Sequence, residues 1–463
     1  MPFTIKRSLN AFCKALGSRI SGLYHAQDNH TKDVIHGASS AFILRVSAAV
    51  LSFVLSIVLT RMLGVGGVGA YFLALSVVSI ATILGRVGLD NALLRFAAAS
   101  KDAQDWVALR GLYSRAIGIT TVASGLLAAT IFLLAPWLGS AVFTDPGVGV
   151  LLSIVAPAIV PIAIYTVLAQ LLQGVNRTKR SIAVLNLWPS ALGLIGSILL
   201  IPGFGVQGAA EAFTAASFLT LLIGWWNWRR AMPHLSGVHG HFAVPTLLKS
   251  SMPLFWASIS QIVITLSATI MLGMWSTSVD VGLYGAAGRG ALLITFVVQA
   301  VTSIASPKFS VLYNQGSMSA LGNLARNSSA LLTLAASPFL IIFWQFPEIV
   351  MRIFGAEFVI GASVLSILAI GQAVNVITGP AGNVLMMCGY ERLVRNVLLA
   401  SATICLIANL ILIPRMGAVG AAIANSATVT FENLTMVVLV WRKFGIMTIP
   451  MPQRIRNMLG ATG

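Results

Sequence analysis

Long apolar runs separated by short polar segments dominate this chain. A helix that crosses a membrane needs about 20 consecutive, mostly apolar residues, and the sequence contains twelve runs of that kind. The runs lie near residues 38–60, 68–89, 112–138, 147–172, 181–201, 206–226, 249–272, 282–305, 328–346, 359–387, 393–413 and 418–440. The pattern predicts an all-α polytopic membrane protein with about 12 transmembrane helices.

The positions of lysine and arginine provide a second test of this count, because cytoplasmic loops carry the positive excess. If the N-terminus is cytoplasmic, most of the 29 Lys and Arg residues fall in the termini and in every second loop. Of those in loops, Arg61, Arg352 and Arg415 alone fall on the other side. A missed span would break this alternation, so we expect an even number of spans and two cytoplasmic termini.

Composition narrows the class of protein further. The chain is 57% hydrophobic and 9% charged, whereas about a quarter of the residues of a soluble protein are charged. The net charge of +17 is spread over short loops beside the membrane, which favours anionic membrane lipids as partners over nucleic acid. The three cysteines form no CxxC pair and indicate neither a disulfide nor a metal site.

An internal repeat divides the chain into two halves. The stretch "LLIPGFGVQGAAEA" begins at residue 199 and returns as "ILIPRMGAVGAAIA" at residue 411, 212 residues later. Likewise "VGAY" at residue 68 returns as "VGLY" at residue 281. Each half then holds six spans with the same orientation. We expect two parallel six-helix repeats around a central cavity, the arrangement of many alternating-access transporters.

Five segments follow from these patterns. The first is amphipathic and basic, which is typical of a helix at a membrane surface. The expected segments are a cytoplasmic N-terminal segment (1–36), an N-terminal six-helix bundle (37–228), a cytoplasmic linker (229–248), a C-terminal six-helix bundle (249–441) and a cytoplasmic tail (442–463).

Three arginines lie inside predicted spans, where a central arginine costs at least about 2.5 to 3.5 kcal/mol unless it has a partner or a wet cavity. Arg86 lies near the end of its span with Asp90 one helical turn on, so an i,i+4 pair accounts for it. Arg45 and Arg289 lie about 10 Å inside their spans, from opposite ends. We expect them to line a cavity, or else to snorkel toward the membrane surface or to pair with Glu432 or Glu211.

Glu211 and Glu432 are the acids within the predicted spans, so arginine outnumbers acid and the cavity should be positive. An anionic substrate fits such a cavity, and the planar fork of arginine suits phosphate. We therefore expect Arg45, Arg289 and Arg86 to bind a pyrophosphate. Glu432 and Glu211 are candidates for ion coupling, and equally for an ion pair or a packing hydrogen bond.

Several chemistries are not favoured. The sequence has no P-loop, and no loop is long enough to carry carboxylates placed for acid–base catalysis. Histidines cluster in residues 232–242 without an acid or cysteine to complete a metal site. We expect no catalytic residues, no metal and no cofactor.

The run "RMLGVGGVGAYFLALSVVSIATILGRVGLDNALLRFAA" (61–98), the basic "GVNRTKR" (174–180) and the repeated "IP..G..GAA.A" resemble bacterial polysaccharide flippases of the multidrug/oligosaccharidyl-lipid/polysaccharide exporter superfamily. This resemblance implies two six-helix bundles around a V-shaped cavity and no cofactor. It also implies that arginines on the first and eighth spans line a cationic cavity. Arg45 and Arg289 match those places by span.

The function implied is transport of a polyprenyl-pyrophosphate-linked oligosaccharide from the cytoplasmic to the outer leaflet of the bacterial inner membrane, in the synthesis of cell-surface polysaccharide. A polysaccharide polymerase and chain-length proteins are expected partners. Three alternatives stay open: a multidrug or cation antiporter of the same superfamily, a membrane scaffold of a polysaccharide assembly complex, and a membrane glycosyltransferase. The antiporter should carry cavity acids, and the glycosyltransferase should need a loop carboxylate.

Overall fold

The computed structural model describes residues 29–143, 145–235, 237 and 240–450, and all regular structure within them is helical. The amphipathic pattern of residues 1–28 lies outside the described residues. The α-helices are α2 (Asn29–Gly85), α3 (Leu89–Asp102), α4 (Trp106–Trp137), α5 (Pro146–Val155), α6 (Ile159–Gly174), α7 (Thr178–Ile182), α8 (Trp188–Ala231), α9 (Val244–Trp275), α10 (Ser278–Asn314), α11 (Met318–Gln345), α12 (Pro347–Phe354), α13 (Ala362–Thr378), α14 (Ala381–Met387) and α15 (Glu391–Phe444).

Shorter pieces complete the helical list. Two are π-helical and three are 3₁₀-helical, and most continue a longer neighbour. They are η1 (Leu138–Val142), η2 (Ala156–Ala158), η3 (Ala183–Leu187), η4 (Pro233–Leu235) and η5 (Ala356–Gly361). Nine helical segments of the described chain are long and apolar enough to cross a membrane, so the structure confirms an all-helical polytopic membrane protein.

Three of these nine segments bend at a glycine whose backbone is not helical, at Gly64 in α2, Gly205 in α8 and Gly417 in α15. Each bend joins two helices and falls in the interval between two apolar runs predicted from the sequence. All three glycines have positive φ, a region that L-residues with a side chain rarely enter. The bends therefore explain why the structure has fewer continuous helical segments than the sequence has apolar runs.

The bends at Gly205 and Gly417 are the same conformation. Gly205 has φ 56° and ψ −132°, and Gly417 has φ 52° and ψ −131°. The two residues occupy equivalent positions in the repeated sequence, 212 residues apart. Three residues further on, Gly208 and Gly420 approach the carbonyl oxygens of Leu200 and Leu412 so closely that neither site has room for a Cβ atom. One sequence pattern thus produces one helical bend twice.

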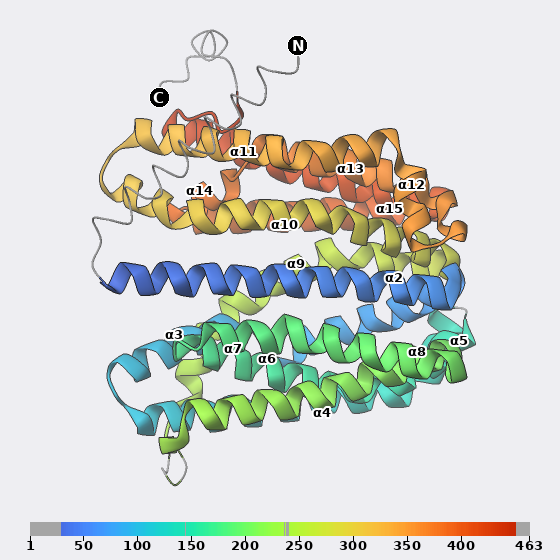
Figure 1. The fold of residues 1–463 in the computed structure, drawn as a ribbon, viewed down its shortest axis with the longest axis horizontal. Coiled ribbons are helices and arrows are strands. Elements are labelled where there is room, and N and C mark those ends of the chain that lie inside the picture. Colours follow the sequence, from blue (N-terminus) through green and yellow to red (C-terminus); the bar gives the residue numbers. More distant parts are fainter. Residues whose placement is uncertain (1–28, 144, 236, 238–239, 451–463) are drawn as a thin grey trace.

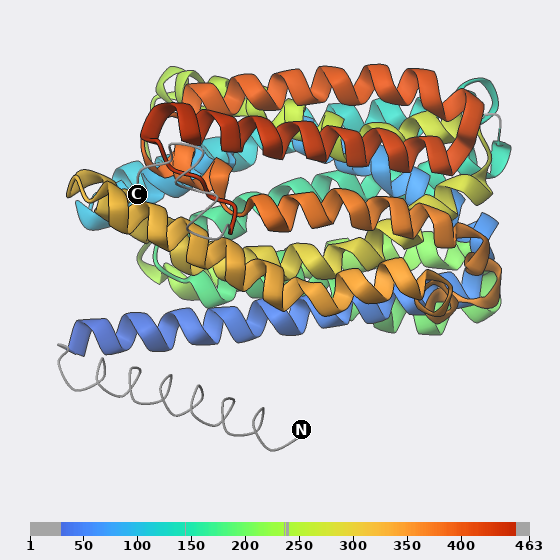
Figure 2. The ribbon, with the colours of Figure 1, turned by 90° about the horizontal axis from the view of Figure 1, so that it is seen from above.

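The helices form two groups, the N-terminal half (29–231) and the C-terminal half (244–444), and the first part of α2 lies against α10 where they meet (Figures 1 and 2). We name the two ends of the bundle by α2: the Arg45 end is where α2 begins, and the Gly64 end is where it bends. The turns between α3 and α4 and between α10 and α11 lie at the Arg45 end (Figure 1).

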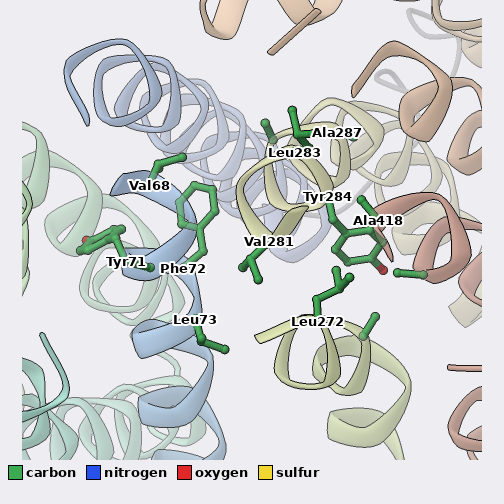
Figure 3. Close-up of a cluster of buried hydrophobic side chains, with 14 of the residues drawn as sticks. Val68, Tyr71, Phe72, Leu73, Leu272, Val281, Leu283, Tyr284, Ala287 and Ala418 are labelled. Carbon is green, nitrogen blue, oxygen red and sulfur yellow. The ribbon is translucent and has the colours of Figure 1, made fainter. Parts of the chain in front are cut away.

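Apolar side chains seal the seam between the halves toward the Gly64 end. Val68 and Phe72 of α2 lie beside Val281 and Leu283 of α10 (Figure 3), and all four are buried. Close packing here depends on glycine, because a Cβ atom on Gly69 would overlap the backbone carbonyl at the start of α10. The two halves are therefore in tight contact at this end.

Three hydrogen bonds between the halves reinforce this seam. The Arg61 guanidinium Nε donates to the Ile353 carbonyl oxygen at 2.9 Å, and the Val65 backbone N–H donates to Glu357 Oε2 at 3.2 Å. The Ser278 hydroxyl donates to Asp145 Oδ2 at 2.7 Å, a bond between α10 and the residue that caps α5. The structure describes the chain in a state that is closed at the Gly64 end.

Candidate functional site: a cationic central cavity

Two adjoining cavities lie between the halves. One, of about 780 Å³, is lined by Arg45 and includes residues of α2, α6, α8, α10 and α11. The other, of about 610 Å³, is lined by Arg289 and includes residues of α2, α9, α10, α13 and α15. We call them the Arg45 cavity and the Arg289 cavity. Four residues line both cavities: Ala49, Ser52, Phe53 and Phe296. The two spaces are therefore continuous along α2 and α10.

Arg289 of α10 is held in place by groups from both halves. Its Nε donates to the Ser56 hydroxyl at 3.0 Å, and Nη1 donates to the Gly285 carbonyl oxygen one turn earlier at 3.2 Å. Its guanidinium carbon lies 3.5 Å from the ring centroid of Phe72, a cation–π geometry. The planar group is thus fixed on one face and along one edge.

Arg289 retains hydrogen-bonding capacity. Of the five N–H groups of a guanidinium, two donate to Ser56 and Gly285, and the other three have no hydrogen-bond partner among the described residues. These three belong to Nη1 and Nη2, the two-nitrogen edge that binds phosphate or carboxylate in a bidentate manner. The side chain is half-buried, so this edge is a preorganised anion-binding group.

Arg45 lies in a more open setting. It is exposed and lines the Arg45 cavity. Arg45 and Ser56 are 11 residues apart on one helix, which separates them by about 16 Å. Ser52 lies between them and lines both cavities. The three positions share one face of α2, and this polar stripe leads from Arg45 to Arg289.

No aspartate or glutamate is among the described residues that line either cavity. Glu211 is exposed on α8, Glu432 is half-buried on α15, and neither lines the cavities. No ion pair joins them to Arg45 or Arg289 in the described part of the chain. The described lining therefore carries positive charge without a countercharge, and the two glutamates have no place in it.

The structure places Arg86 apart from the other two arginines. Its Nη1 lies 2.7 Å from Asp90 Oδ2, which confirms the i,i+4 pair predicted from the sequence. Burial raises the pKa of Asp90, and the adjacent Arg86 partly offsets this effect. Arg86 lines neither of the two cavities. The pair explains how a cation is accommodated at this depth.

Other cavity residues were not singled out from the sequence. Ser56 and Phe72 contact Arg289, while Gln261, Gln372 and Asn425 line its cavity. Arg45, Ser52 and Ser56 recur at helical spacing within an apolar span, a signal that marks one polar face of a helix. No comparable local signal exists for Phe72, because an aromatic residue in a span is ordinary.

Comparison with known proteins places the chain in a family. Residues 34–312 match the family model described as polysaccharide biosynthesis protein, which spans more than half of the chain. The chain belongs to this family, which confirms the resemblance seen in the sequence. A relative from Haloferax volcanii, described as "Probable low-salt glycan biosynthesis flippase Agl15", is 25% identical over 407 residues, which cover 85% of this chain and 80% of the relative.

Solved structures show the same fold. The lipid II flippase MurJ in an inward closed conformation matches with a TM-score of 0.71 at 14% identity, covering 88% of this chain and 87% of MurJ. A multidrug resistance MATE family transporter of the MOP superfamily, in an inward-facing conformation, matches with a TM-score of 0.69 at 14% identity, covering 87% of this chain and 98% of the transporter. The chain therefore has a fold that is found both in a lipid II flippase and in a multidrug resistance transporter.

Proposed function

We propose that this protein is a flippase for a polyprenyl-pyrophosphate-linked oligosaccharide, acting by alternating access in the synthesis of cell-surface polysaccharide such as lipopolysaccharide or exopolysaccharide. The observation that carries the proposal is the free two-nitrogen edge of Arg289 in a cavity whose described lining has no carboxylate. Membership of the polysaccharide biosynthesis family and the likeness to a glycan flippase support it.

Electrostatics favours a phosphate ligand. A cation held away from bulk water without a countercharge is costly, and a diphosphate that contacts the Nη1 and Nη2 groups would offset that cost. Charge-assisted hydrogen bonds of this kind contribute about 1.5 to 3 kcal/mol each. Arg289 is already oriented by Ser56 and Phe72, so its side chain loses little further conformational entropy when the ligand binds.

The proposed path runs along α2. Arg45 would receive the pyrophosphate from the cytoplasmic leaflet, Arg289 would hold it near the seam, and the seam at the Gly64 end would then open toward the outer leaflet. This path assigns the Arg45 end to the cytoplasm and places twelve crossings, in two parallel six-helix repeats, in a bacterial inner membrane. The repeated bends at Gly205 and Gly417 support the repeats. Arg86 has no part in the path, because Asp90 already neutralises it.

A second candidate function is multidrug or cation antiport, which the fold shared with a MATE transporter favours. Such a transporter exports cationic compounds, and the described lining of both cavities offers arginine rather than carboxylate. Glu432 and Glu211 are the candidates for proton coupling in either function. A membrane scaffold would need neither arginine in the cavity.

The test is a leaflet-distribution assay in liposomes that contain the purified protein and a fluorescent polyprenyl diphosphate carrying one sugar. Wild type should equilibrate the lipid between leaflets. Arg289→Ala should slow this at least about tenfold, since charge-assisted bonds are lost, and Arg45→Ala should slow it less. Arg415→Ala is the matched control, because Arg415 is exposed at the Gly64 end and lines neither cavity.

Two results would contradict the proposal. If Arg289→Ala transfers the lipid at the wild-type rate, Arg289 has a structural role and does not bind the transported diphosphate. Failure of wild type to move the lipid, together with efflux of a cationic dye driven by a proton gradient, would establish the antiporter instead. In the second case Glu432→Gln and Glu211→Gln would identify the coupling acid.

A further inference from the structure

Neutral hydrogen-bonding side chains from the C-terminal half line the Arg289 cavity. Gln261 and Thr265 come from α9, Gln372 from α13 and Asn425 from α15. Gln261 and Thr265 are one helical turn apart, and the Gln261 amide Nε2 donates to the Thr265 hydroxyl at 3.3 Å. The Gln372 amide oxygen accepts a bond from the Asn375 Nδ2 at 3.2 Å. The side chains form a polar wall without formal charge.

Asn425 is the most informative of these side chains. Some asparagines within these helices donate to the carbonyl oxygen four residues earlier, as Asn433 does to Val429 at 2.9 Å and Asn227 does to Ile223 at 2.9 Å. The Asn425 amide makes no hydrogen bond to the described part of the chain, although it is half-buried and lies within a helical stretch. It lines the cavity with its donors and acceptor unused.

The same contrast holds for a threonine. Thr82, Thr220 and Thr428 all donate to the carbonyl oxygen four residues earlier. Thr269 of α9 lines the Arg289 cavity and makes no hydrogen bond to the described residues. A side chain that leaves its usual backbone partner unused, within a cavity, is available to a ligand. Gln261, Thr269, Gln372 and Asn425 thus retain bonding capacity toward one space.

The chemistry of this wall matches sugar hydroxyls. A hydroxyl group both donates and accepts, and so do an amide and another hydroxyl, whereas a carboxylate can only accept and a guanidinium can only donate. A further phosphate beyond the diphosphate, or an acidic sugar, would need a cation in addition to Arg289, and a basic sugar would need a carboxylate. Among the described residues that line the Arg289 cavity, Arg289 is the one charged group.

We propose that Gln261, Gln372 and Asn425 form a subsite for a neutral sugar, next to the diphosphate held by Arg289. This inference rests on the proposed flippase function and narrows its substrate to a glycan whose first unit carries no charge. The subsite would recognise the sugar, while Arg289 would bind the diphosphate, which all polyprenyl diphosphate carriers share.

The test compares the affinities of purified wild type for a bare polyprenyl diphosphate and for the same lipid carrying one glucose, one galactose, one N-acetylglucosamine or one glucuronic acid. At least one neutral sugar should tighten binding about tenfold over the bare lipid. In the Gln372→Leu/Asn425→Leu double variant, the glycosylated lipid should bind about as tightly as the bare lipid. The affinity for the bare lipid should be unchanged, since the lost hydrogen bonds are to the sugar alone. Asn433→Leu is the matched control on α15, because its amide is already bonded within the helix.

The outcomes separate the two proposals. If wild type binds the bare lipid and every glycosylated lipid equally, while Arg289→Ala loses all of them, the flippase proposal stands and the sugar subsite is refuted. A wild-type preference for glucuronic acid, or a neutral-sugar preference that persists in the double variant, would also refute the subsite. If neither bare nor glycosylated lipid binds to wild type, both proposals fail. Equal thermal unfolding of wild type and the double variant excludes misfolding as the cause.

Discussion

The Nε group of Arg289 on α10 donates a hydrogen bond of 3.0 Å to the hydroxyl of Ser56 on α2. This contact joins residues 233 positions apart and places a cation at the boundary between the two halves of the protein. A ligand bound there would contact both halves, so its binding free energy would depend on how they are arranged. That dependence is what an alternating-access transporter needs.

The Phe72 ring should contribute to anion binding without touching the anion. Phe72→Leu removes the cation–π contact at 3.5 Å and leaves the guanidinium less firmly oriented. We expect about fivefold to thirtyfold weaker binding of a bare polyprenyl diphosphate, in line with about 1 to 2 kcal/mol for such contacts. Phe72→Tyr keeps the ring and should bind within about twofold of wild type. Equal losses in both variants would exclude the ring's π-face as the cause.

The bond between Ser278 and Asp145 should favour the closed state of the Gly64 end. In Ser278→Ala, the open state should gain population by up to about tenfold, since a bond to a charged group is lost on closure. Double electron–electron resonance would measure the distance distribution between spin labels at Phe204→Cys and Met416→Cys, and the open state would add longer distances. Both positions are exposed beside equivalent bends, and the native cysteines would be replaced.

Ser140→Ala is the control for this measurement, because the Ser140 hydroxyl donates to the Pro136 carbonyl oxygen within one continuous helical segment, Trp106–Val142. It should leave the distance distribution unchanged. An unchanged distribution in Ser278→Ala as well would show that the apolar seam alone holds this end closed.

The two equivalent bends should differ in their tolerance of a side chain. Gly205→Ala strains the backbone, at a cost of about 1 kcal/mol or more, but a Cβ atom there has nothing within 4 Å. In Gly417→Ala the new Cβ would also lie 2.8 Å from Asp280 Oδ2. We expect a larger drop in Tm for Gly417→Ala than for Gly205→Ala.

Gly203→Ala provides the baseline for this comparison, because Gly203 has helical backbone and open space around its Cβ position. It should leave Tm unchanged or raise it slightly. Equal Tm values for Gly203→Ala and Gly205→Ala would contradict a strained bend at Gly205.

Arg86 should act through Asp90 rather than through substrate. Arg86→Gln removes the cation that lowers the pKa of Asp90, so the pKa, already raised by burial, should rise further. The folded state then binds this proton more tightly than the unfolded chain does. The associated stability is present below the unfolded pKa and is lost as pH rises through the folded pKa.

The Tm deficit of Arg86→Gln should therefore shrink as pH is lowered, and adding Asp90→Asn should abolish that pH dependence. The Arg86→Gln/Asp90→Asn double variant should bind polyprenyl diphosphate as wild type does. If this well-folded variant binds polyprenyl diphosphate more weakly than wild type, Arg86 contributes to substrate binding, as expected from the sequence.

The sequence by itself determined the membrane class, the repeated segment and the arginines that need an explanation. Apolar run length and the cost of an intramembrane charge belong to a single segment, so they can be read without knowing which helices are neighbours. The Arg86–Asp90 pair could be predicted for the same reason, because one helical turn sets the spacing.

Tertiary structure alone decided what surrounds Arg289. Ser56 and Phe72 reach it from another helix, and Gln261, Gln372 and Asn425 line its cavity from three more. The spacing of Arg45, Ser52 and Ser56 marks one polar face of α2, but no local pattern shows that Ser56 contacts Arg289 or that the other side chains face the same space. Only the packing of α2 against α10 turns these separate side chains into one cationic, carboxylate-free space, because the free energy of a charge depends on the groups that fold around it.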